Sequence, residues 1–502
     1  MEDTPHTPQF GFAIDHRKCI GCHACTVACK AENDVPIGKF RTWVKYTEKG
    51  TFPSVKRHFT VLRCNHCDDA PCVKICPVNA LNKRPDAIVD LDRDACVGCS
   101  GCMQACPYDA IYLNEDTGTA EKCHYCAHRT ERGLEPACVV VCPEQAIVSG
   151  DVSDEDSPIA TLIREETTSQ RKLEKGTSPR VWYIDALPEA LRPNSAQEPK
   201  QYIWSDRKRP PPQVPAGFEA PDDVINVLDV DHPPVWGWHI WTYLVTKNLA
   251  AGAMISAPFL VGAGLAAESQ LQLVPEAVGL GFLGITLALL VHDLGRPERF
   301  LKLLLSPNTD SWLVKGAWVL TGFGLLTTVS LALIFFDAHE LAQTVRYVNL
   351  PFAVGASGYS AWLFHQCLAR DLWLEGGLFP KLVLRAATLG LALGVTLVAP
   401  SGGGMMLAAS YAVAVALLLA LEYRPVKRTT DGARAHAIME ATGKPRVGAL
   451  LHLVAAGFLL CGAAFGGVFG MVLGAVALAL TIVGQFIHEK AWIEAGQAVP
   501  IS

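Results

Sequence analysis

Sixteen of the 18 cysteines lie before residue 143, and their spacing is that of metal ligands. They form four groups, each opening with C-x2-C and closing with C-x3-C. The groups are Cys19, Cys22, Cys25 and Cys29; Cys64, Cys67, Cys72 and Cys76; Cys96, Cys99, Cys102 and Cys106; and Cys123, Cys126, Cys138 and Cys142. Three thiolates on a tight loop reach three irons of one cubane, while the fourth points toward a neighbouring cluster. The spacing therefore predicts [4Fe–4S] clusters, and sixteen ligands suffice for four of them.

Zinc and disulfide bonds are the other common uses of cysteine. Zinc ribbons pair C-x2-C units across longer gaps, whereas two of the groups pack four cysteines into eleven residues. Residues 1–10 are polar and lack the charged and apolar regions of a secretory signal, so we expect the cysteines to stay reduced in the cytosol. The net charge of −6 also argues against a nucleic-acid partner.

The cysteine-rich part, from Gly11 to about Tyr183, resembles the iron–sulfur subunit of DMSO-reductase-type molybdenum oxidoreductases. The matching segments are GFAIDHRKCIGCHACTVACK, CNHCDDAPCVKICPVNAL, ACVGCSGCMQACPYDAIY and KCHYC…ACVVVCPEQAI. The resemblance implies an α+β ferredoxin-like tandem that exchanges ligands between groups one and four, and between groups two and three. The first to fourth ligand sets it implies are Cys19, Cys22, Cys25 and Cys142; Cys123, Cys126, Cys138 and Cys29; Cys64, Cys67, Cys72 and Cys106; and Cys96, Cys99, Cys102 and Cys76. In that family the first set faces the molybdenum subunit and the fourth faces the membrane.

The composition changes in the middle of the chain. Charged residues number 62 among residues 1–235 but only 30 among residues 236–502. Residues 188–235 are rich in proline and charge, including RKRPPPQVP at 207–215, and predict a semi-rigid linker. This linker is either a surface tail or a strap along the first domain. We therefore divide the chain into a four-cluster domain at 1–187, the linker at 188–235 and a membrane anchor at 236–502.

Eight apolar stretches of the second half are long enough to cross a hydrocarbon core of about 30 Å, which takes roughly 20 helical residues. They lie at 238–264, 272–292, 313–336, 347–367, 380–399, 403–422, 447–466 and 468–488. This predicts an all-α bundle of eight transmembrane helices. The connections on one side hold fourteen Lys and Arg, whereas only Arg346 lies on the other side. Lys381 and Arg385 are counted among the fourteen, in the connection between the fourth and fifth stretches. Positive loops stay inside, so the cluster domain should face the cytoplasm at a bacterial inner membrane.

Three segments of the second half resemble the polysulfide-reductase-type (NrfD-like) quinone anchor, which is normally a separate chain. They are YLVTKNLAAGAM, LLVHDLGRPERFLKLLLSPNTDSWLVKGAWVL and GYSAWLF. The resemblance implies a haem-free anchor that exchanges electrons with menaquinone or ubiquinone. It also implies a molybdopterin-containing partner that oxidises formate or sulfite, or reduces an oxyanion or a sulfur compound.

Ionisable residues inside or at the ends of the spans are candidates for a quinone and proton site. His239, Tyr243 and Lys247 are spaced by four, which places them on one face of the first span. His292, Asp293 and Arg296 end the second span. Asp293 and Arg296 either form an ion pair at the helix end or carry protons. Lys247 neutralises a carboxylate, contacts a quinone or takes part in proton movement.

Other features of the anchor suggest alternatives. No clear pair of histidines recurs at mid-membrane depth on two spans, so we expect no haem. We interpret His365 as interfacial and Cys367 and Cys461 as packing residues.

A second hypothesis for the function is an ion-translocating module resembling the anchors of alternative complex III. No continuous polar file across the far helices is evident in the sequence, however. A third, a self-contained enzyme, lacks any molybdopterin, Rossmann or P-loop signature.

Overall fold

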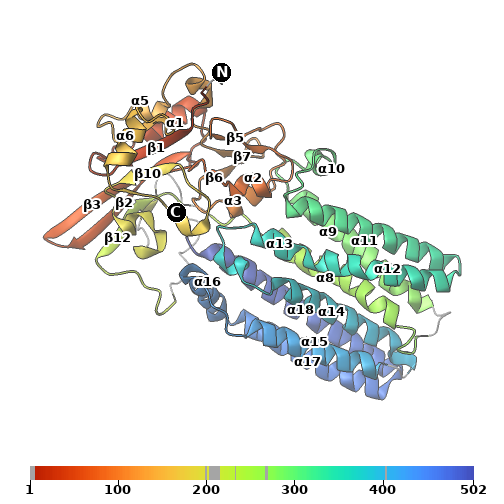
Figure 1. Cartoon of the computed structure of the whole chain (residues 1–502). Coiled ribbons are helices and arrows are strands. Elements are labelled where there is room, and N and C mark those ends of the chain that lie inside the picture. The colour runs from red at the N-terminus through yellow and green to blue at the C-terminus, as the bar shows by residue number, and fades with distance from the viewer. Residues whose placement is uncertain (1–5, 198–200, 203–214, 232, 266–269, 402–403) are drawn as a thin grey trace.

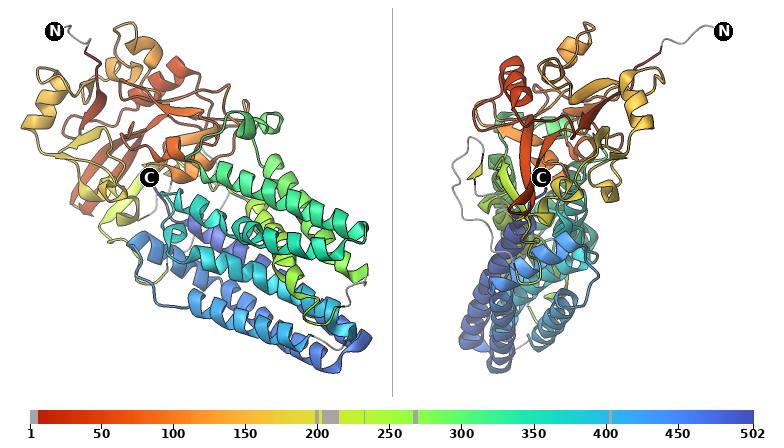
Figure 2. Two further views of the ribbon diagram at one scale, coloured as in Figure 1. Left: turned by 45° about the vertical axis from the view of Figure 1, so that its right-hand side comes forward. Right: turned by 90° about the vertical axis from the view of Figure 1, so that its left-hand side faces the viewer.

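The structure is a computed structural model that describes residues 6–197, 201–202, 215–231, 233–265, 270–401 and 404–502. Residues 207–214 of the proline-rich segment lie outside the described residues. A head of strands and short helices, which contains all four cysteine groups, sits at one end of a bundle of long helices (Figure 1). The two further views show the same arrangement (Figure 2).

The first sheet of the head places the two ends of the cysteine-rich region side by side. Its order is β8 (Ile147–Asp151), β1 (Phe10–Asp15), β10 (Val181–Ile184) and β9 (Thr168–Ser169). Strand β1 is antiparallel to β8 and parallel to β10. Because β1 directly precedes the first cysteine group and β8 directly follows the fourth, their pairing brings these two groups together. Helix α1 (Ala24–Asn33) then packs on α5 (Ala137–Val140), and α4 (Ala127–Thr130) lies between them in sequence.

The second and third cysteine groups are positioned by a similar arrangement of smaller elements. Helix α2 (Pro71–Ile75) carries Cys72 and packs against α3 (Gly101–Ala105), which carries Cys102. A hairpin follows each helix: β4 (Leu81–Lys83) with β5 (Val89–Leu91), and β6 (Ile111–Asn114) with β7 (Thr119–Lys122). The cysteines, α2, α3 and the hairpins share one hydrophobic core with residues of the bundle such as Ile240 and Leu244.

The second sheet includes part of the predicted linker. Its order is β11 (Gln201–Tyr202), β12 (Val224–Asp229), β2 (Thr42–Thr51) and β3 (Ser54–Arg63). Strand β12 pairs antiparallel with β2, and buried Asn226 accepts a hydrogen bond from Thr47 Oγ1 at 2.9 Å. Helices α6 (Pro158–Glu165) and α7 (Pro188–Leu191) complete the head. The structure thus lays residues 224–229 along the head as a strap.

The bundle contains long helices at the positions of the predicted apolar stretches. They are α8 (Trp238–Ser256), α9 (Val274–His292), α11 (Trp312–Phe335), α12 (His339–Gly358), α14 (Leu378–Val398), α15 (Met405–Glu422), α17 (Lys444–Phe465) and α18 (Gly467–Ala498). Among the described residues, six of them are long and apolar enough to cross a membrane, all but α8 and α12. Those two carry buried polar residues, including Lys247 and Asn248 on α8 and Arg346 on α12. Helices α10 (Lys302–Leu305), α13 (Ser360–His365) and α16 (Thr430–Ala441) lie at the head end.

The bundle exposes apolar residues and buries charged ones, the reverse of a soluble protein. Leu325, Val413 and Val468 are at least 60% exposed, whereas Lys247 and Glu489 are no more than 1% exposed. Exposing apolar side chains to hydrocarbon carries no free-energy penalty, whereas buried polar groups must find partners inside the bundle. This distribution is that of a bundle surrounded by lipid.

Two charged residues lie elsewhere than the sequence placed them. Lys381 and Arg385, assigned to a connection, are part of helix α14, and the Arg385 side chain is buried. The prediction that Arg385 is a loop residue is therefore wrong. The guanidinium is stabilised inside the bundle by carboxylates of other helices, which no local pattern of the sequence reveals.

Candidate electron-transfer site

Two cavities in the head are each lined by one of the implied ligand sets. The first contains the thiols of the first set, Cys19, Cys22, Cys25 and Cys142. The second contains those of the second set, Cys29, Cys123, Cys126 and Cys138. In both cavities three cysteines come from one sequence group and the fourth comes from the other. The pairing of β1 with β8 and of α1 with α5 produces this exchange.

The other two sets are also brought together. Cys106 lies within electrostatic range of the second group, and Cys76 lies within range of the third. Within the described part of the chain, no three His, Cys, Asp or Glu side chains converge tightly enough to hold a single metal ion. Four free thiols spread around a small space suit a cubane better than one zinc ion. The donors present thus fit [4Fe–4S] clusters.

The four ligand sets follow one another in a file. Neighbouring sets approach through three pairs of thiols in electrostatic range: Cys25 with Cys138, Cys123 with Cys64, and Cys102 with Cys72. At one end of this file Cys22 of the first set is exposed at the surface. At the other end the fourth set lies against the bundle. The file therefore runs from the outer face of the head to the bundle.

The loop between α9 and α11 binds the backbone around the fourth set. The hydrogen bonds are Gly295 N to Gly98 O (3.2 Å), Arg296 N to Val97 O (3.1 Å), Arg299 Nη1 to Cys96 O (2.8 Å), Asn308 Nδ2 to Cys76 O (2.8 Å) and Ser311 Oγ to Ile75 O (2.7 Å). Five bonds from one loop fix the position of this set relative to the end of α9.

Gly295 lets the loop and the head approach this closely. A Cβ added to Gly295 would lie 2.3 Å from the carbonyl oxygen of Gly118, which is backbone and cannot move aside. We expect Gly295→Ala to push the loop away from the fourth set and to slow electron transfer into the bundle. Hydrogen exchange should rise at the backbone amides of residues 295 and 296, which donate to Gly98 O and Val97 O. Gly281→Ala on α9 is the control, because nothing lies within 4 Å of its added Cβ. Unchanged exchange in Gly295→Ala would contradict this docking.

Three of the predicted site residues meet next to the fourth set. The His239 Nδ1 lies 3.2 Å from Asp293 Oδ1, and its Nε2 lies 3.0 Å from His292 Nδ1. Asp293 is half-buried at the end of α9, in electrostatic range of the Cys99 thiol, and burial raises the pKa of its carboxyl to about 7. His292 is exposed. The three side chains can therefore pass a proton between solvent and the space beside the fourth set.

The other three predicted site residues lie apart from this cluster. Arg296 donates to Thr117 O at 2.5 Å and pairs with Glu298, so the ion pair of Asp293 is with His239 and not with Arg296. Tyr243 and Lys247 follow His239 at one and two turns along α8, so Lys247 is about 12 Å deeper in the bundle. His365 contacts Glu375 O at 3.4 Å near the head end.

Lys247 has buried polar partners of its own. Its Nζ donates to Ser357 O at 2.9 Å and to Ser360 Oγ at 2.6 Å, and it lies 4.7 Å from the centroid of the Tyr359 ring. Glu489 on α18 is a carboxylate that acts on it at longer range. Three roles were predicted for Lys247, one of them the neutralisation of a carboxylate. Its hydrogen-bond partners are a carbonyl and a hydroxyl oxygen, so the ammonium group does not bond directly to a carboxylate.

Comparison with known proteins agrees with both halves of the chain. Residues 226–501 match the family model described as polysulphide reductase, NrfD, and residues 55–152 match a 4Fe-4S dicluster domain. The chain belongs to the NrfD family. With its six apolar helices, it is a multi-pass membrane protein. It is a fusion, because the head is similar to proteins that are separate iron–sulfur subunits.

Three such relatives match the head. The putative iron–sulfur subunit of dimethyl sulfoxide reductase from Halobacterium salinarum is 41% identical over 214 residues, 37% of this chain and 82% of the relative. A subunit of tetrathionate reductase from Salmonella typhimurium is 46% identical over 180 residues, which cover 35% and 72%. A component of polysulfide reductase from Wolinella succinogenes is 37% identical over 179 residues, which cover 35% and 94%.

The NrfD part also contains a charged cluster that the sequence did not reveal. Arg385 on α14 donates to Glu489 Oε1 on α18 at 2.7 Å and to Glu422 Oε1 on α15 at 2.8 Å. His488 Nε2 lies 2.5 Å from the same guanidinium. All four side chains are largely buried. Each ionisable side chain lies near the end of an apolar stretch, so only the packing of three helices shows that they belong together.

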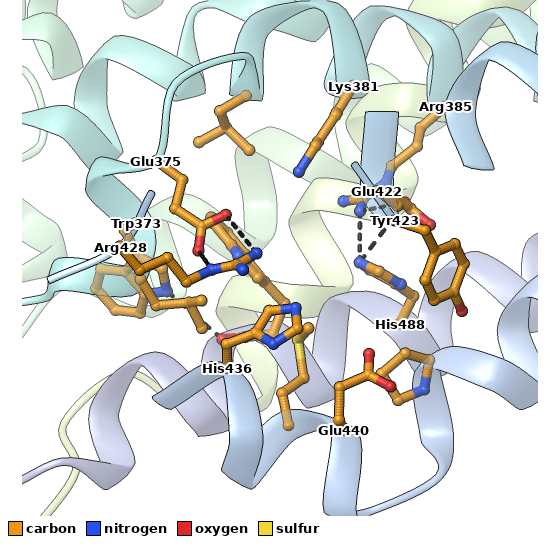
Figure 3. Close-up of a pocket in the computed structure, with 15 residues that line it drawn as sticks. Trp373, Glu375, Lys381, Arg385, Glu422, Tyr423, Arg428, His436, Glu440 and His488 are labelled. Carbon is orange, nitrogen blue, oxygen red and sulfur yellow. Dashed lines mark hydrogen bonds and ion pairs between the residues drawn. The ribbon is translucent and has the colours of Figure 1, made fainter. Parts of the chain in front are cut away.

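This charged cluster forms one wall of a cavity near the head end of the bundle. Figure 3 shows Arg385, Glu422 and His488 on one side and the Arg428–Glu375 pair on the other, with the Lys381 ammonium between them. A second, smaller cavity continues from Arg385 and His488 to buried His452 on α17. The far helices thus place one more ionisable side chain, His452, beside a cavity that borders the charged cluster.

Proposed function

We propose that this chain carries electrons between a molybdopterin-containing catalytic subunit and the membrane quinone pool through four [4Fe–4S] clusters. The observation that carries the proposal is the file of four cysteine sets, which joins an exposed face of the head to an acid–base cluster at the bundle. The similar proteins support it, since their names describe components of reductases, one of them an iron–sulfur subunit.

The outer end of the file suits a protein partner. Cys22 is exposed, and around the first and last cysteine groups Ile20, Val27 and Val140 are each more than 50% exposed. Exposed apolar residues of this size are typical of a surface that another protein covers. We place the molybdopterin subunit there, beside the first ligand set.

The inner end of the file suits quinone chemistry. When bound, a [4Fe–4S] cluster supplies one electron at a time, whereas a quinone takes up two electrons and two protons. Asp293 and His239 lie where protons are needed, beside the fourth set at the end of α9. His292 connects the pair to solvent. These residues would hold and exchange the protons, and a quinone would bind between them and the apolar helices.

We propose further that all eight long helices cross the membrane. Helix α8 lies inside the bundle against α9 and α14, and α12 packs against α11 and α8 with Arg346 and Asn349 buried, so these polar residues face protein rather than lipid. Eight crossings place both ends of the anchor on the side of the head. Most Lys and Arg connections lie there too, so we place the head in the cytoplasm at a bacterial inner membrane.

The test uses the chain with its native clusters, reduced by dithionite and then mixed with a menaquinone analogue. We expect rapid reoxidation in the unmodified chain and a rate about 100-fold lower in Asp293→Asn, because a positioned proton-transfer group contributes about 10²–10⁴-fold. Stopped-flow absorbance of the clusters measures both rates.

The matched control is Asp310→Asn, an exposed carboxylate of the same loop. Its reoxidation rate should equal that of the unmodified chain. Reduction of the clusters by the catalytic partner should be normal in both variants. If quinone does not reoxidise the unmodified chain, the proposed function fails; if only Asp293→Asn is unaffected, the proton site lies elsewhere.

A second candidate function, ion translocation, is favoured by the charged cluster of the far helices. Electron transfer from the fourth set does not need Arg385, Glu489, Glu422 or His488, which lie on other helices. Through Glu489 this cluster reaches Lys247 electrostatically, and at the opposite end of the bundle Arg346 is buried against Glu276 at 2.7 Å. Polar groups therefore occur along the bundle between its two ends. The measurement is proton release or uptake by proteoliposomes during quinone turnover.

A further inference from the structure

Arg63, at the end of β3, is a fully buried arginine beside the second ligand set. Its side chain is 0% exposed and lines the cavity that contains Cys29, Cys123, Cys126 and Cys138. The guanidinium donates to Cys138 Sγ at 3.3 Å and to Thr42 Oγ1 at 3.2 Å. It also lies over the Phe12 ring, 4.3 Å from the centroid.

The surroundings of Arg63 do not neutralise its charge in the usual way. A buried guanidinium needs an anionic partner, because isolated charges are very costly in a protein interior. Arg41, in the same cavity, has such a partner in Glu121 at 3.0 Å. For Arg63 the main negative groups are the thiolates of Cys138, Cys123 and Cys25, and its Nε has no hydrogen-bond partner among the described residues.

We propose that Arg63 is a positioning residue that raises the reduction potential of the cluster held by the second ligand set. A [4Fe–4S] cluster with four thiolate ligands is anionic, and reduction adds one negative charge. A fixed positive charge with a hydrogen bond to a ligand sulfur stabilises the reduced state more than the oxidised one. Arg63 therefore favours an electron on the second site. This inference rests on the proposed cluster assignment.

The test is an EPR-monitored redox titration of the full chain with its native clusters, in which dithionite supplies the electrons. We expect Arg63→Met to weaken one-electron reduction of one component at least tenfold, equivalent to about 60 mV for a one-electron couple. Arg63→Lys should keep the potential near that of the unmodified chain. Cys126→Ser identifies the component that belongs to the second set, because it alters a ligand of that set only.

Two further variants and three outcomes decide the proposal. Arg57→Met, an exposed arginine on the same strand that pairs with Glu48, should leave every potential unchanged. Arg63→Gln keeps a hydrogen-bond donor without the charge and should behave as Arg63→Met. The proposal is overturned if Arg63→Gln matches the unmodified chain, if all components shift equally, or if both neutral variants lose iron that Arg63→Lys retains. Absence of cluster signals in the unmodified chain would instead refute the cluster assignment.

Discussion

Replacing Cys99 by serine should abolish quinone-linked turnover while the first three clusters still accept electrons from the partner. Cys99 belongs to the fourth ligand set and lies in electrostatic range of Asp293, which places it between the file and the proposed quinone site. A hydroxyl is a poorer ligand for iron than a thiolate. We therefore expect the fourth cluster to be lost or converted, which leaves no carrier between the third set and the bundle.

Two measurements together check this expectation. EPR of the dithionite-reduced chain should lose or change one component of four, and partner-driven reduction of an artificial dye should continue. Cys367→Ser is the control, since Cys367 is a buried thiol that belongs to no ligand set and whose Sγ contacts Leu363 O at 3.5 Å. Unchanged EPR signals together with unchanged quinone reduction in Cys99→Ser would refute the ligand assignment.

The cysteine sets could be anticipated because their information is local. A loop with C-x2-C spacing presents its thiolates to one cluster in any context, and the last cysteine points to a neighbouring one. Which groups exchange that ligand was implied by the family resemblance and not by the spacing. The long helices were also predictable, because each apolar stretch must be long enough to cross lipid. The cluster of His239, His292 and Asp293 could also be anticipated. These residues are ionisable, and they lie at the ends of two neighbouring spans.

Contacts between distant segments could not be predicted in the same way. Arg385 and Glu489 are 104 residues apart, and Arg385 and Glu422 are 37 apart, so neither pair has a local signature. The Arg385 charge was therefore assigned to a connection, although it lies within an apolar stretch. Likewise, Arg296 was a candidate partner of Asp293 by sequence, but the docked head offers it the Thr117 carbonyl instead.

Removing Arg385 alone should destabilise the bundle more than removing it together with Glu489. Arg385→Met leaves the buried carboxylates of Glu489 and Glu422 without the guanidinium that they share. Breaking a buried ion pair from one side costs about 3–5 kcal/mol. The double variant Arg385→Met/Glu489→Met removes both charges of the pair, and such replacements are often neutral or stabilising. Glu422 keeps His488 at 3.7 Å in that variant. Thermal denaturation in detergent measures the difference.

The double variant separates electron transfer from ion translocation. Because it should fold and leaves the ligand sets and Asp293 untouched, quinone-linked turnover should persist. If the charged cluster carries protons, pH changes in proteoliposomes beyond those of the quinone chemistry itself should disappear in this variant. Lys444→Met/Glu494→Met, which removes a partly exposed ion pair at the head end, should retain these pH changes. If the unmodified chain shows only the protons of quinone chemistry, the second candidate function fails, and Arg385 and Glu489 serve to hold α14 against α18.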